Sequence, residues 1–143
     1  MTVKGILDIK GRDVVTIASE RTLKEAAELL AERRIGAVVV LDDAGRIRGI
    51  LSERDIVRAI ARDGASALDM AVSAVMTPKV RTCRESHTIN EVMQIMTQGR
   101  FRHLPVEEGG RLAGIVSIGD VVKGRIEEVE REAEEIRTYI ATA

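Results

Sequence analysis

Two Ser-x-x-Asp segments in this sequence place a hydroxyl and a carboxylate at a spacing that suits the start of a helix. The first runs from Ser52 to Asp55 and the second from Ser117 to Asp120, each after a glycine and two apolar residues. A helix that starts at the serine presents backbone amides and partial positive charge to an anion. The aspartate in its first turn can accept both hydroxyls of a ribose, as carboxylates do in dinucleotide sites. The indicated chemistry is binding of a phosphorylated nucleoside.

Helix capping explains the same spacing without any ligand. A serine hydroxyl can accept from the third helical amide while the aspartate accepts from the cap amide, and such a cap stabilises a helix by about 1 kcal/mol. For either segment taken alone, capping is the more common role. The spacing leaves both interpretations open.

Neither segment is accompanied by the residues of a catalytic centre. His87 and His103 are the only histidines, Cys83 has no obvious base beside it in the sequence, and no Cys/His pair has metal-ligand spacing. The glycines within 109–114 do not form a dinucleotide fingerprint, and no Gly-Lys-Ser/Thr phosphate loop occurs. We therefore expect a binding protein, not an enzyme, and no metal site.

The two segments belong to an internal duplication. Residues 49–57 recur as 114–122 with an offset of 65, whereas stretches further upstream recur with an offset of 66: 22–27 as 88–93 and 35–40 as 101–106. The change in offset falls in a turn, where one residue can be lost with little damage to the flanking strands. Self-similarity on this scale predicts two copies of one structural unit.

Each copy is expected to fold as β-α-β-β-α, giving an α/β (α+β) protein. Apolar periodicity and turn residues predict these elements: a short helix over 3–9, a strand over 14–17, a helix from 23, strands over 37–41 and 46–51, a helix from 52 to about 62, a connecting helix over 67–76, a strand over 79–82, a helix over 88–97, strands over 103–106 and 111–116, and a helix from 117 to about 139. The implied boundaries are 1–63 for the first repeat with its N-terminal helix, 64–76 for the connection, 77–125 for the second repeat and 126–143 for a helical extension.

The last helix carries apolar residues at alternating spacings of four and three: Val122, Ile126, Val129, Ala133, Ile136 and Ile140. Such a stripe can pack against its own domain, and it covers fewer than about three heptads, which is short for a coiled coil. The charged residues within 127–132 leave the stripe narrow, which suits a helix that meets its symmetry mate. We favour a homodimer through this helix.

Composition excludes several classes of protein. With one Phe, one Tyr and no Trp among 143 residues, the core must be aliphatic and base-stacking platforms are scarce. A formal net charge of -1 gives no reason to expect binding to nucleic acid or to an acidic membrane. The N-terminus lacks the apolar stretch of a signal peptide, and no run is long enough to span a bilayer. We expect a cytoplasmic location.

These motifs together resemble paired cystathionine-β-synthase (CBS) domains, the Bateman module, here as a stand-alone CBS-domain protein. The resemblance rests on the repeated β-α-β-β-α order, on Leu104-Pro105-Val106 and on both Gly-apolar-apolar-Ser-x-x-Asp segments. It implies two pseudo-symmetric repeats packed together, with clefts between them that bind adenosine-containing ligands in many members. It also implies that such modules dimerise into a flat disk.

The resemblance also implies roles for individual residues. Asp55 and Asp120 would bind ribose hydroxyls, and Ser52 and Ser117 would contact ribose or phosphate. The basic pair Arg102 and His103 would face phosphates at the second site. The aligned pair in the first copy, Gly36 and Ala37, is uncharged, so that Arg54 or residues across the interface could serve there instead. The full set of expected ligand-binding residues is Gly36, Ser52, Arg54, Asp55, Arg102, His103, Pro105, Ser117 and Asp120. The copies also depart from each other, since Val39 aligns with Pro105 and Gly119 with Arg54.

The expected function is that of a regulatory module that senses an adenine nucleotide. AMP is our first choice of ligand, with ADP, ATP and NAD(H) as others, and the basic pair favours all of these over S-adenosylmethionine. Signalling would pass by conformational change to a separate protein that the sequence does not name. The alternative is a structural dimerisation module whose Ser-x-x-Asp segments only cap helices.

Overall fold

The computed structural model describes residues 1–142 and divides into two compact units. One comprises residues 1–12, 82–107 and the chain from 113 onward, and the other comprises 13–81 and 108–112. We call them the C-terminal unit and the N-terminal unit after the copy that supplies most of each.

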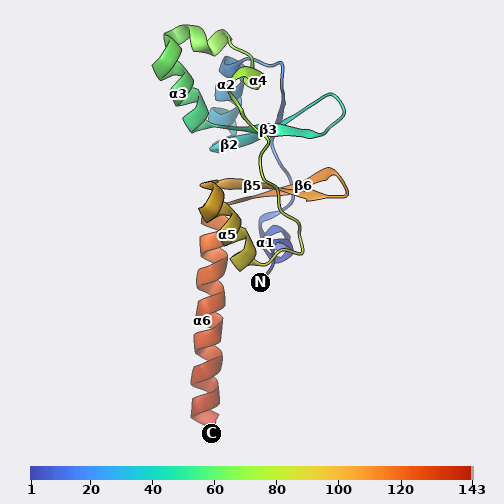
Figure 1. Cartoon of the computed structure of the whole chain (residues 1–143). Helices are drawn as coiled ribbons and strands as arrows, with labels where there is room; N and C mark the ends of the chain where they lie inside the picture. The colour runs from blue at the N-terminus through green and yellow to red at the C-terminus, as the bar shows by residue number, and fades with distance from the viewer. Residues whose placement is uncertain (143) are drawn as a thin grey trace. The chain divides into compact units, whose positions relative to one another are not determined.

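The N-terminal unit packs helices on a four-stranded sheet (Figure 1). Its elements in chain order are β1 (Thr16–Ala18), α2 (Leu23–Arg33), β2 (Ala37–Leu41), β3 (Ile47–Ser52), α3 (Glu53–Asp63), the 3-10 helix η1 (Gly64–Asp69), α4 (Val72–Val75) and β4 (Thr77–Pro78). The strand order is β1-β2-β3-β4, with β1 parallel to β2 and the other pairs antiparallel. Leu23, Val38, Val40 and Leu51 are fully buried between helices and sheet, so the core is aliphatic as predicted.

The C-terminal unit combines a two-stranded hairpin with three helices. Its elements are α1 (Val3–Lys10), α5 (Ile89–Gly99), β5 (His103–Glu108), β6 (Arg111–Ser117) and α6 (Ile118–Thr142). Leu7, Ile89, Leu104, Val106 and Val116 form the centre of its core. The mixed helix and strand architecture and the long final helix confirm the predicted fold class.

The duplication extends to the ends of the matching helices α2 and α5. Thr22 and Thr88 cap their N-termini, each accepting a hydrogen bond from the amide three residues ahead. Arg34 and Arg100 close their C-termini in the left-handed conformation, with φ of 54° and 56°. Only a few per cent of non-glycine residues have positive φ, so this shared cap is strong evidence that the two copies fold alike.

The predicted strand over 79–82 is wrong. The strand that forms, β4, covers only Thr77 and Pro78 and pairs with Ile50 and Gly49 of β3. Pro78 has no amide to donate, which confines it to the edge of a sheet. Lys79 has a φ of 52° and therefore turns the chain out of the extended conformation.

The single connecting helix predicted over 67–76 is also wrong, because it divides into η1 and α4. Between them the backbone is extended at Met70, whose carbonyl accepts a hydrogen bond of 2.9 Å from the amide of Leu23. Ala71 forms a bridge with Thr22. Pairing with the start of α2 thus replaces the helical hydrogen bonds at this point.

The N-terminal helix α1 packs with residues of the second copy. The amides of Val3 and Lys4 donate to the carbonyls of His87 and Glu85, each at 2.9 Å. Thr2 bridges Thr88, just as Ala71 bridges Thr22 in the other unit. Residues 1–12 of the first copy thus belong to the C-terminal unit, and residues 77–81 of the second copy belong to the N-terminal unit. We call these two stretches the leading segments. The boundaries at 63, 76 and 125 stay predictions.

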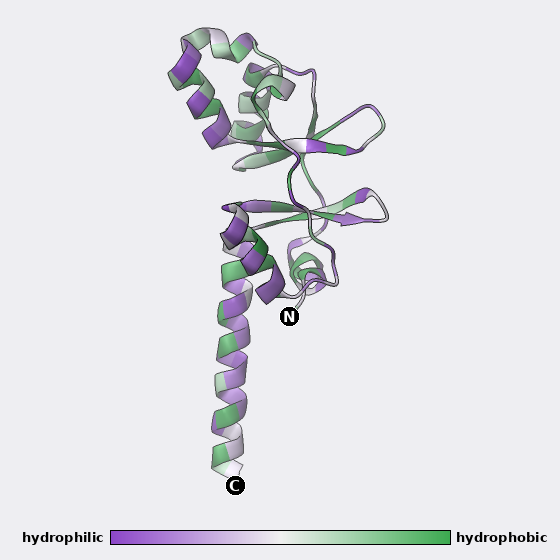
Figure 2. Cartoon of the chain, in the orientation of Figure 1, coloured by the Kyte–Doolittle hydropathy of each residue, from purple (hydrophilic) through white to green (hydrophobic). Residues whose placement is uncertain are grey.

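Helix α6 follows the predicted span and continues to Thr142. One face packs on its own unit, where Val121 and Gly124 are buried and a Cβ at Gly124 would meet Ile89 at 2.7 Å. The predicted apolar stripe lies on a different face and is mostly exposed, and Figure 2 shows hydrophobic residues recurring to the far end of α6. The alternative in which the stripe packs against its own domain is therefore wrong.

Candidate ligand-binding sites at two helix N-termini

The first Ser-x-x-Asp segment forms a complete capping box at the start of α3. Ser52 has extended backbone angles, its hydroxyl accepts from the Asp55 amide at 3.2 Å, and its own amide donates to Asp55 Oδ2 at 2.9 Å. Ser52 Oγ also lies 3.2 Å from the same carboxylate oxygen. The carboxylate is therefore held in one orientation at the end of β3, which is what a ribose-binding group requires.

Asp55 receives a further contact from the segment that the second copy contributes. Thr77 Oγ1 lies 3.5 Å from Asp55 Oδ1, the oxygen that the cap leaves available. The approach of β4 depends on Gly49, because a Cβ at that position would collide with the backbone carbonyl of Thr77. The glycine that opens the Gly-apolar-apolar-Ser-x-x-Asp motif thus brings a hydroxyl close to the carboxylate.

The second segment repeats this geometry at the start of α6. The Ser117 amide donates to Asp120 Oδ2 at 2.8 Å, and the Asp120 amide donates to Ser117 Oγ at 3.1 Å. Gly114 again allows a close approach, since a Cβ there would lie 2.9 Å from the Leu7 side chain of α1. The two copies thus build the same cap from the same motif.

A lysine distinguishes the second site from the first. Lys10 Nζ lies 2.6 Å from Asp120 Oδ2 and donates to the carbonyl of Ile115 at 2.9 Å. Partial burial by itself raises the pKa of Asp120, but the hydrogen bond from Lys10, the bonds from Ser117 and the charge of Lys10 outweigh it. The pKa of Asp120 is therefore below its usual value, and its carboxylate is ionised and paired.

Lys10 and Thr77 are residues that the sequence analysis missed. Each lies in a leading segment and contacts the cap aspartate of the other copy: Lys10 contacts Asp120, and Thr77 contacts Asp55. The offset of 66 contained the signal, because extending it backwards aligns Gly11 with Thr77 and places Lys10 one residue away. Neither residue belongs to a recognisable motif.

Gly36 and Arg102 are brought to the two sites by equivalent backbone bonds. The Glu53 amide donates to the Gly36 carbonyl at 2.9 Å, and the Ile118 amide donates to the Arg102 carbonyl at 2.8 Å. Two of the first three helical amides are therefore occupied in each copy, one by this carbonyl and one by the cap serine. The helix N-termini offer an anion fewer free amides than the sequence analysis assumed.

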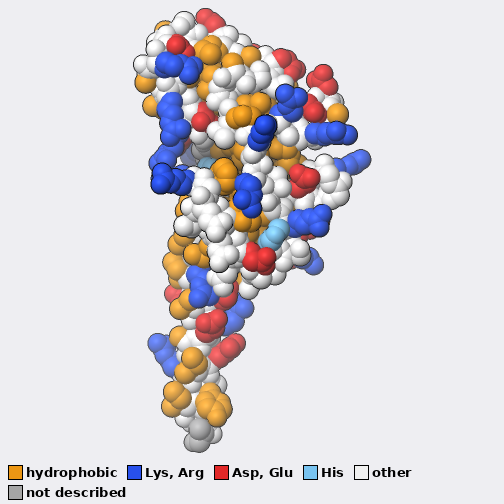
Figure 3. Space-filling view, in the orientation of Figure 1, with side chains coloured by type: hydrophobic (Ala, Val, Ile, Leu, Met, Phe, Trp, Pro, Cys, Tyr) orange, Lys and Arg blue, Asp and Glu red, His pale blue; other side chains and the backbone are white. Residues whose placement is uncertain are grey.

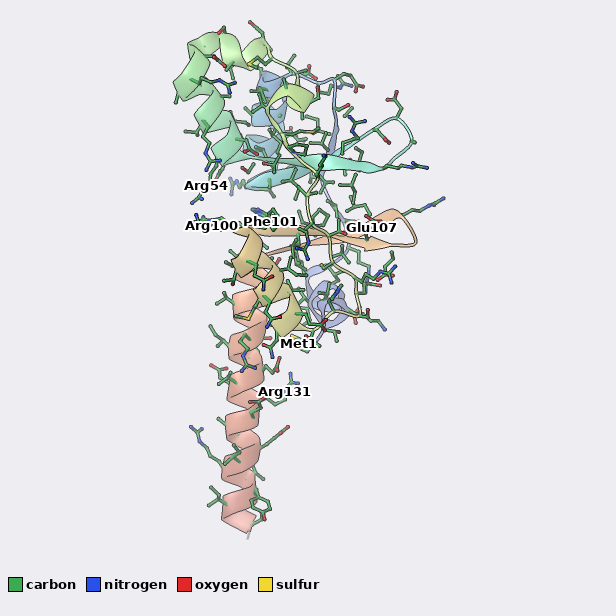
Figure 4. All side chains as sticks on the ribbon, viewed as in Figure 1. Met1, Arg54, Arg100, Phe101, Glu107 and Arg131 are labelled. Atoms are coloured by element: carbon green, nitrogen blue, oxygen red, sulfur yellow. The ribbon has the colours of Figure 1, made fainter. Side chains whose placement is uncertain are left out.

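The remaining predicted residues differ in how accessible they are. Arg54, labelled on α3 in Figure 4, and Arg102 are exposed, whereas His103 is half-buried at the start of β5. Pro105 is buried in the middle of β5, and its carbonyl accepts from the Cys83 amide at 3.0 Å. The structure therefore brings the Arg102 backbone next to the residue that follows Ser117, and it buries Pro105 within β5.

One depression includes Asp120 of the second site, and another lies beside α3 but is lined by neither Ser52 nor Asp55. A cavity of about 290 Å³ is lined by Lys10, Asp120 and Lys123 together with apolar side chains of α1 and α6. A groove of about 560 Å³ beside α3 includes Gly36, Arg34 and Glu53 among mainly apolar residues of α2 and α3. The groove lies within the range of about 300 to 1,000 Å³ that is typical of small-molecule sites, and the cavity lies at its lower limit.

Comparison with known proteins agrees with this geometry. The family model of the CBS domain matches the chain twice, over residues 6–62 and 72–127. The chain belongs to the CBS-domain family. Its two matched segments each contain one Ser-x-x-Asp cap, so the capping geometry is a repeated feature of this CBS pair.

Solved and curated CBS proteins resemble this CBS pair over most of its length. A CBS-domain containing protein from Agrobacterium tumefaciens is 55% identical, with a TM-score of 0.84 over 87% of this chain and 92% of that one. A mitochondrial CBS domain-containing protein of Arabidopsis thaliana is 30% identical over 97% of this chain and 71% of its own. The CBS pair of protein MJ0100, solved with 5'-methylthioadenosine and S-adenosyl-L-methionine, is 26% identical, with a TM-score of 0.79 over 90% of this chain and 98% of that one.

Within residues 1–142, no cluster of side chains suited to hold a metal ion occurs. None of the helices described is both long and apolar enough to cross a membrane. CBS pairs are regulatory modules, and nothing in the two caps supplies a nucleophile paired with a base. The chemistry that these sites offer is recognition through hydrogen bonds and charge.

Proposed function

We propose that this CBS pair binds an adenine nucleotide and acts as a regulatory module for another protein. The observation that carries the proposal is the orientation of Asp55 and Asp120 by equivalent caps, at 2.9 Å and 2.8 Å from the serine amides. A repeated, fixed carboxylate at the end of a strand is suited to the two hydroxyls of a ribose. The adenosine-containing ligands of protein MJ0100 support the same ligand class.

In the proposed complex, Asp55 and Asp120 hold ribose hydroxyls, while Ser52 and Ser117 keep them in position. Arg102 and His103 contact phosphate at the second site, and Arg54 supplies the exposed positive charge at the first. Lys10 must release Asp120 or move toward a phosphate before Asp120 can accept both hydroxyls. We therefore expect the Asp55 site to bind more readily than the Asp120 site.

The basic groups favour a phosphorylated ligand, and we propose AMP first, followed by ADP, ATP and NAD(H). S-adenosylmethionine, which lacks a phosphate, serves as a comparison. Binding would change the arrangement of a homodimer, and a separate protein would respond to that change. This effector and a cytoplasmic location stay predictions from the sequence.

Calorimetric titration of each ligand tests the proposal. We expect heat from AMP with the wild-type protein, loss of one binding event in Asp55→Asn, and loss of a weaker one in Asp120→Asn. Asparagine retains an acceptor for the cap amide, so thermal unfolding should show that both variants stay folded. Asp69→Asn, which changes an aspartate outside both caps, is the matched control and should bind like the wild type.

The capping boxes themselves favour the second candidate function, a structural dimerisation module. The hydrogen bonds of the cap between Ser52 and Asp55 are complete without any ligand. Helix capping alone therefore explains the geometry of these two residues. The absence of heat and of any thermal shift with all five ligands would support this candidate. A ligand that binds only the native state raises the free energy of unfolding by about 2.7 kcal/mol at about a hundredfold excess over its dissociation constant. Such a stabilisation would exclude the purely structural module.

A further inference from the structure

The exposed stripe of α6 has the form of a coiled-coil seam. Its members occupy alternating first and fourth heptad positions, a and d, and five of them expose about half or more of their surface: Val122 45%, Ile126 53%, Val129 46%, Ile136 60% and Ile140 68%. Figure 3 shows hydrophobic side chains along the outer length of α6. A continuous apolar stripe of this kind is unfavourable in water and marks an interaction surface.

The seam faces away from the protein's own unit. Val121, Gly124 and Glu128, which pack on that unit or pair with the N-terminus, occupy the c and f positions of the same heptads. These positions lie on the side of a helix opposite a and d. A partner can therefore cover the seam while the body of the protein stays on the far side of α6.

The distal part of α6 lacks support from the described residues of its own unit. From Val129 to Thr142 every side chain is exposed except Ala133, which is half-buried. Arg131, labelled in Figure 4, belongs to this stretch, which extends beyond the contact between Met1 and Glu128. An isolated helix of about 12 to 15 residues is marginal in water, so this stretch needs a partner to be stable.

The charges beside the seam are complementary to those of a second copy of this chain. We propose that α6 pairs with α6 of another protomer as a parallel, in-register two-helix coiled coil. In that arrangement each g residue meets the e residue of the next heptad on the partner helix. Arg125 would meet Glu130, and Glu132 would meet Arg137, so both contacts join opposite charges and both occur twice by symmetry.

An antiparallel pair does not satisfy the same residues. If all seam residues overlap, e meets e and g meets g, which places Glu130 against Glu130, Glu132 against Glu132 and Lys123 against Arg137. Sliding the helices by one heptad removes these repulsions but leaves seam residues at one end of α6 uncovered. Only the parallel register both buries the whole seam and pairs its charges.

Two arginines of the proposed pairs already make contacts within α6. Arg125 lies 3.2 Å from Glu128, and Arg137 lies 3.7 Å from Glu134. A guanidinium carries five donors in a fork, so each arginine can keep this neighbour and still reach a carboxylate across the interface. The contacts orient the arginines on the helix surface and leave further N–H donors available for a partner helix.

A charge exchange in the full-length protein tests the register. We expect sedimentation to give a mass of two chains, and Glu132→Arg or Arg137→Glu alone to raise the dimer dissociation constant about tenfold. The double variant should recover wild-type affinity, because the exchanged pair again joins opposite charges in the parallel register. Glu135→Arg, at an outward c position, should change nothing.

In either shifted antiparallel register, the double variant places like charges together and stays weakened, which would overturn the proposal. A monomer at all accessible concentrations would overturn it as well. A mass of three chains would also overturn it, since β-branched residues at d are compatible with trimers.

Val129→Cys provides a second measurement, since only the parallel register places this residue beside its own copy within disulfide reach. We expect a covalent dimer on oxidation, with wild-type protein as the background control; no crosslink would contradict the register. Pairing requires no nucleotide, so this proposal can fail while the proposed function stands.

Discussion

At the scale of single residues, Lys10 makes the two caps of this CBS pair different. Its ammonium lies 2.6 Å from the carboxylate of Asp120, whereas Asp55 has the neutral hydroxyl of Thr77 at 3.5 Å. A sugar hydroxyl can replace a neutral hydroxyl at little electrostatic cost, but displacing an ammonium leaves two charges to be satisfied again. We therefore expect the two proposed sites, which are built from one duplicated motif, to differ in affinity through one residue outside the motif.

The lowered pKa of Asp120 predicts a pH dependence of stability. The folded-state pKa is below the unfolded value of about 3.9, so the stabilisation is complete above that value and is lost as pH falls through the folded pKa. The free energies of unfolding in urea of wild type and Asp120→Asn should differ by a constant amount from neutral pH to about pH 5, and this difference should shrink below about pH 4.

Lys10→Met should bring the pKa of Asp120 closer to its ordinary value, as measured by NMR of the carboxyl group. An unchanged titration in Lys10→Met would contradict this assignment.

At the scale of elements, α2 and α5 end in the same strained conformation. Arg34 and Arg100 adopt positive φ, which costs an L-residue about 1 to 2 kcal/mol relative to the right-handed region. Glycine adopts it without a steric penalty, and it is the usual residue at this cap.

Arg34→Gly is therefore expected to leave stability unchanged or raise it by up to about 1 kcal/mol, as measured by urea unfolding. Arg33→Gly is the matched control, because Arg33 is the last residue of α2 with helical geometry. Glycine inside a helix costs up to about 1 kcal/mol, so the neighbouring substitution should destabilise. Equal losses in both variants would show that the left-handed cap does not form.

The elements were largely predictable, whereas their partners were not. The strand Ala37–Leu41 and the helix starts at Ser52, Thr88 and Ser117 followed from local apolar runs and capping residues. Periodicity does not state which other elements a strand or helix packs with, so neither the pairing of β4 with β3 nor the packing of α1 with the second copy was predicted. The Lys10 contact spans 110 residues of sequence, and no local pattern encodes it. The prediction of Ser52, Asp55, Ser117 and Asp120 as one repeated arrangement came from the duplication.

At the scale of the whole molecule, each unit depends on a segment from the other copy. Leu7 of α1 is fully buried in the C-terminal unit, while Ile9 of the same helix is 74% exposed. Leu7→Ala should therefore destabilise by about 2 to 5 kcal/mol, as buried leucines commonly do. Ile9→Ala should change stability by less than about 0.5 kcal/mol, as surface substitutions do.

Hydrogen exchange should locate the effect of Leu7→Ala in residues 82–107, which share a core with Leu7, although they are distant in sequence. Exchange that increases mainly within 13–81 would contradict the packing of α1 with the second copy. Urea unfolding of the two variants, measured in parallel, supplies the free energies.

The exchange of leading segments also sets an order of events during synthesis. Residues 13–81, which form most of the N-terminal unit, leave the ribosome together and can begin to pack while translation continues. Helix α1 precedes these residues in the chain, yet its partners Glu85 and His87 and the rest of its core follow only after them. Although helix α1 precedes residues 13–81 in the chain, it cannot take its final place until residues 82–107 have been made, because those residues supply much of the core that it joins.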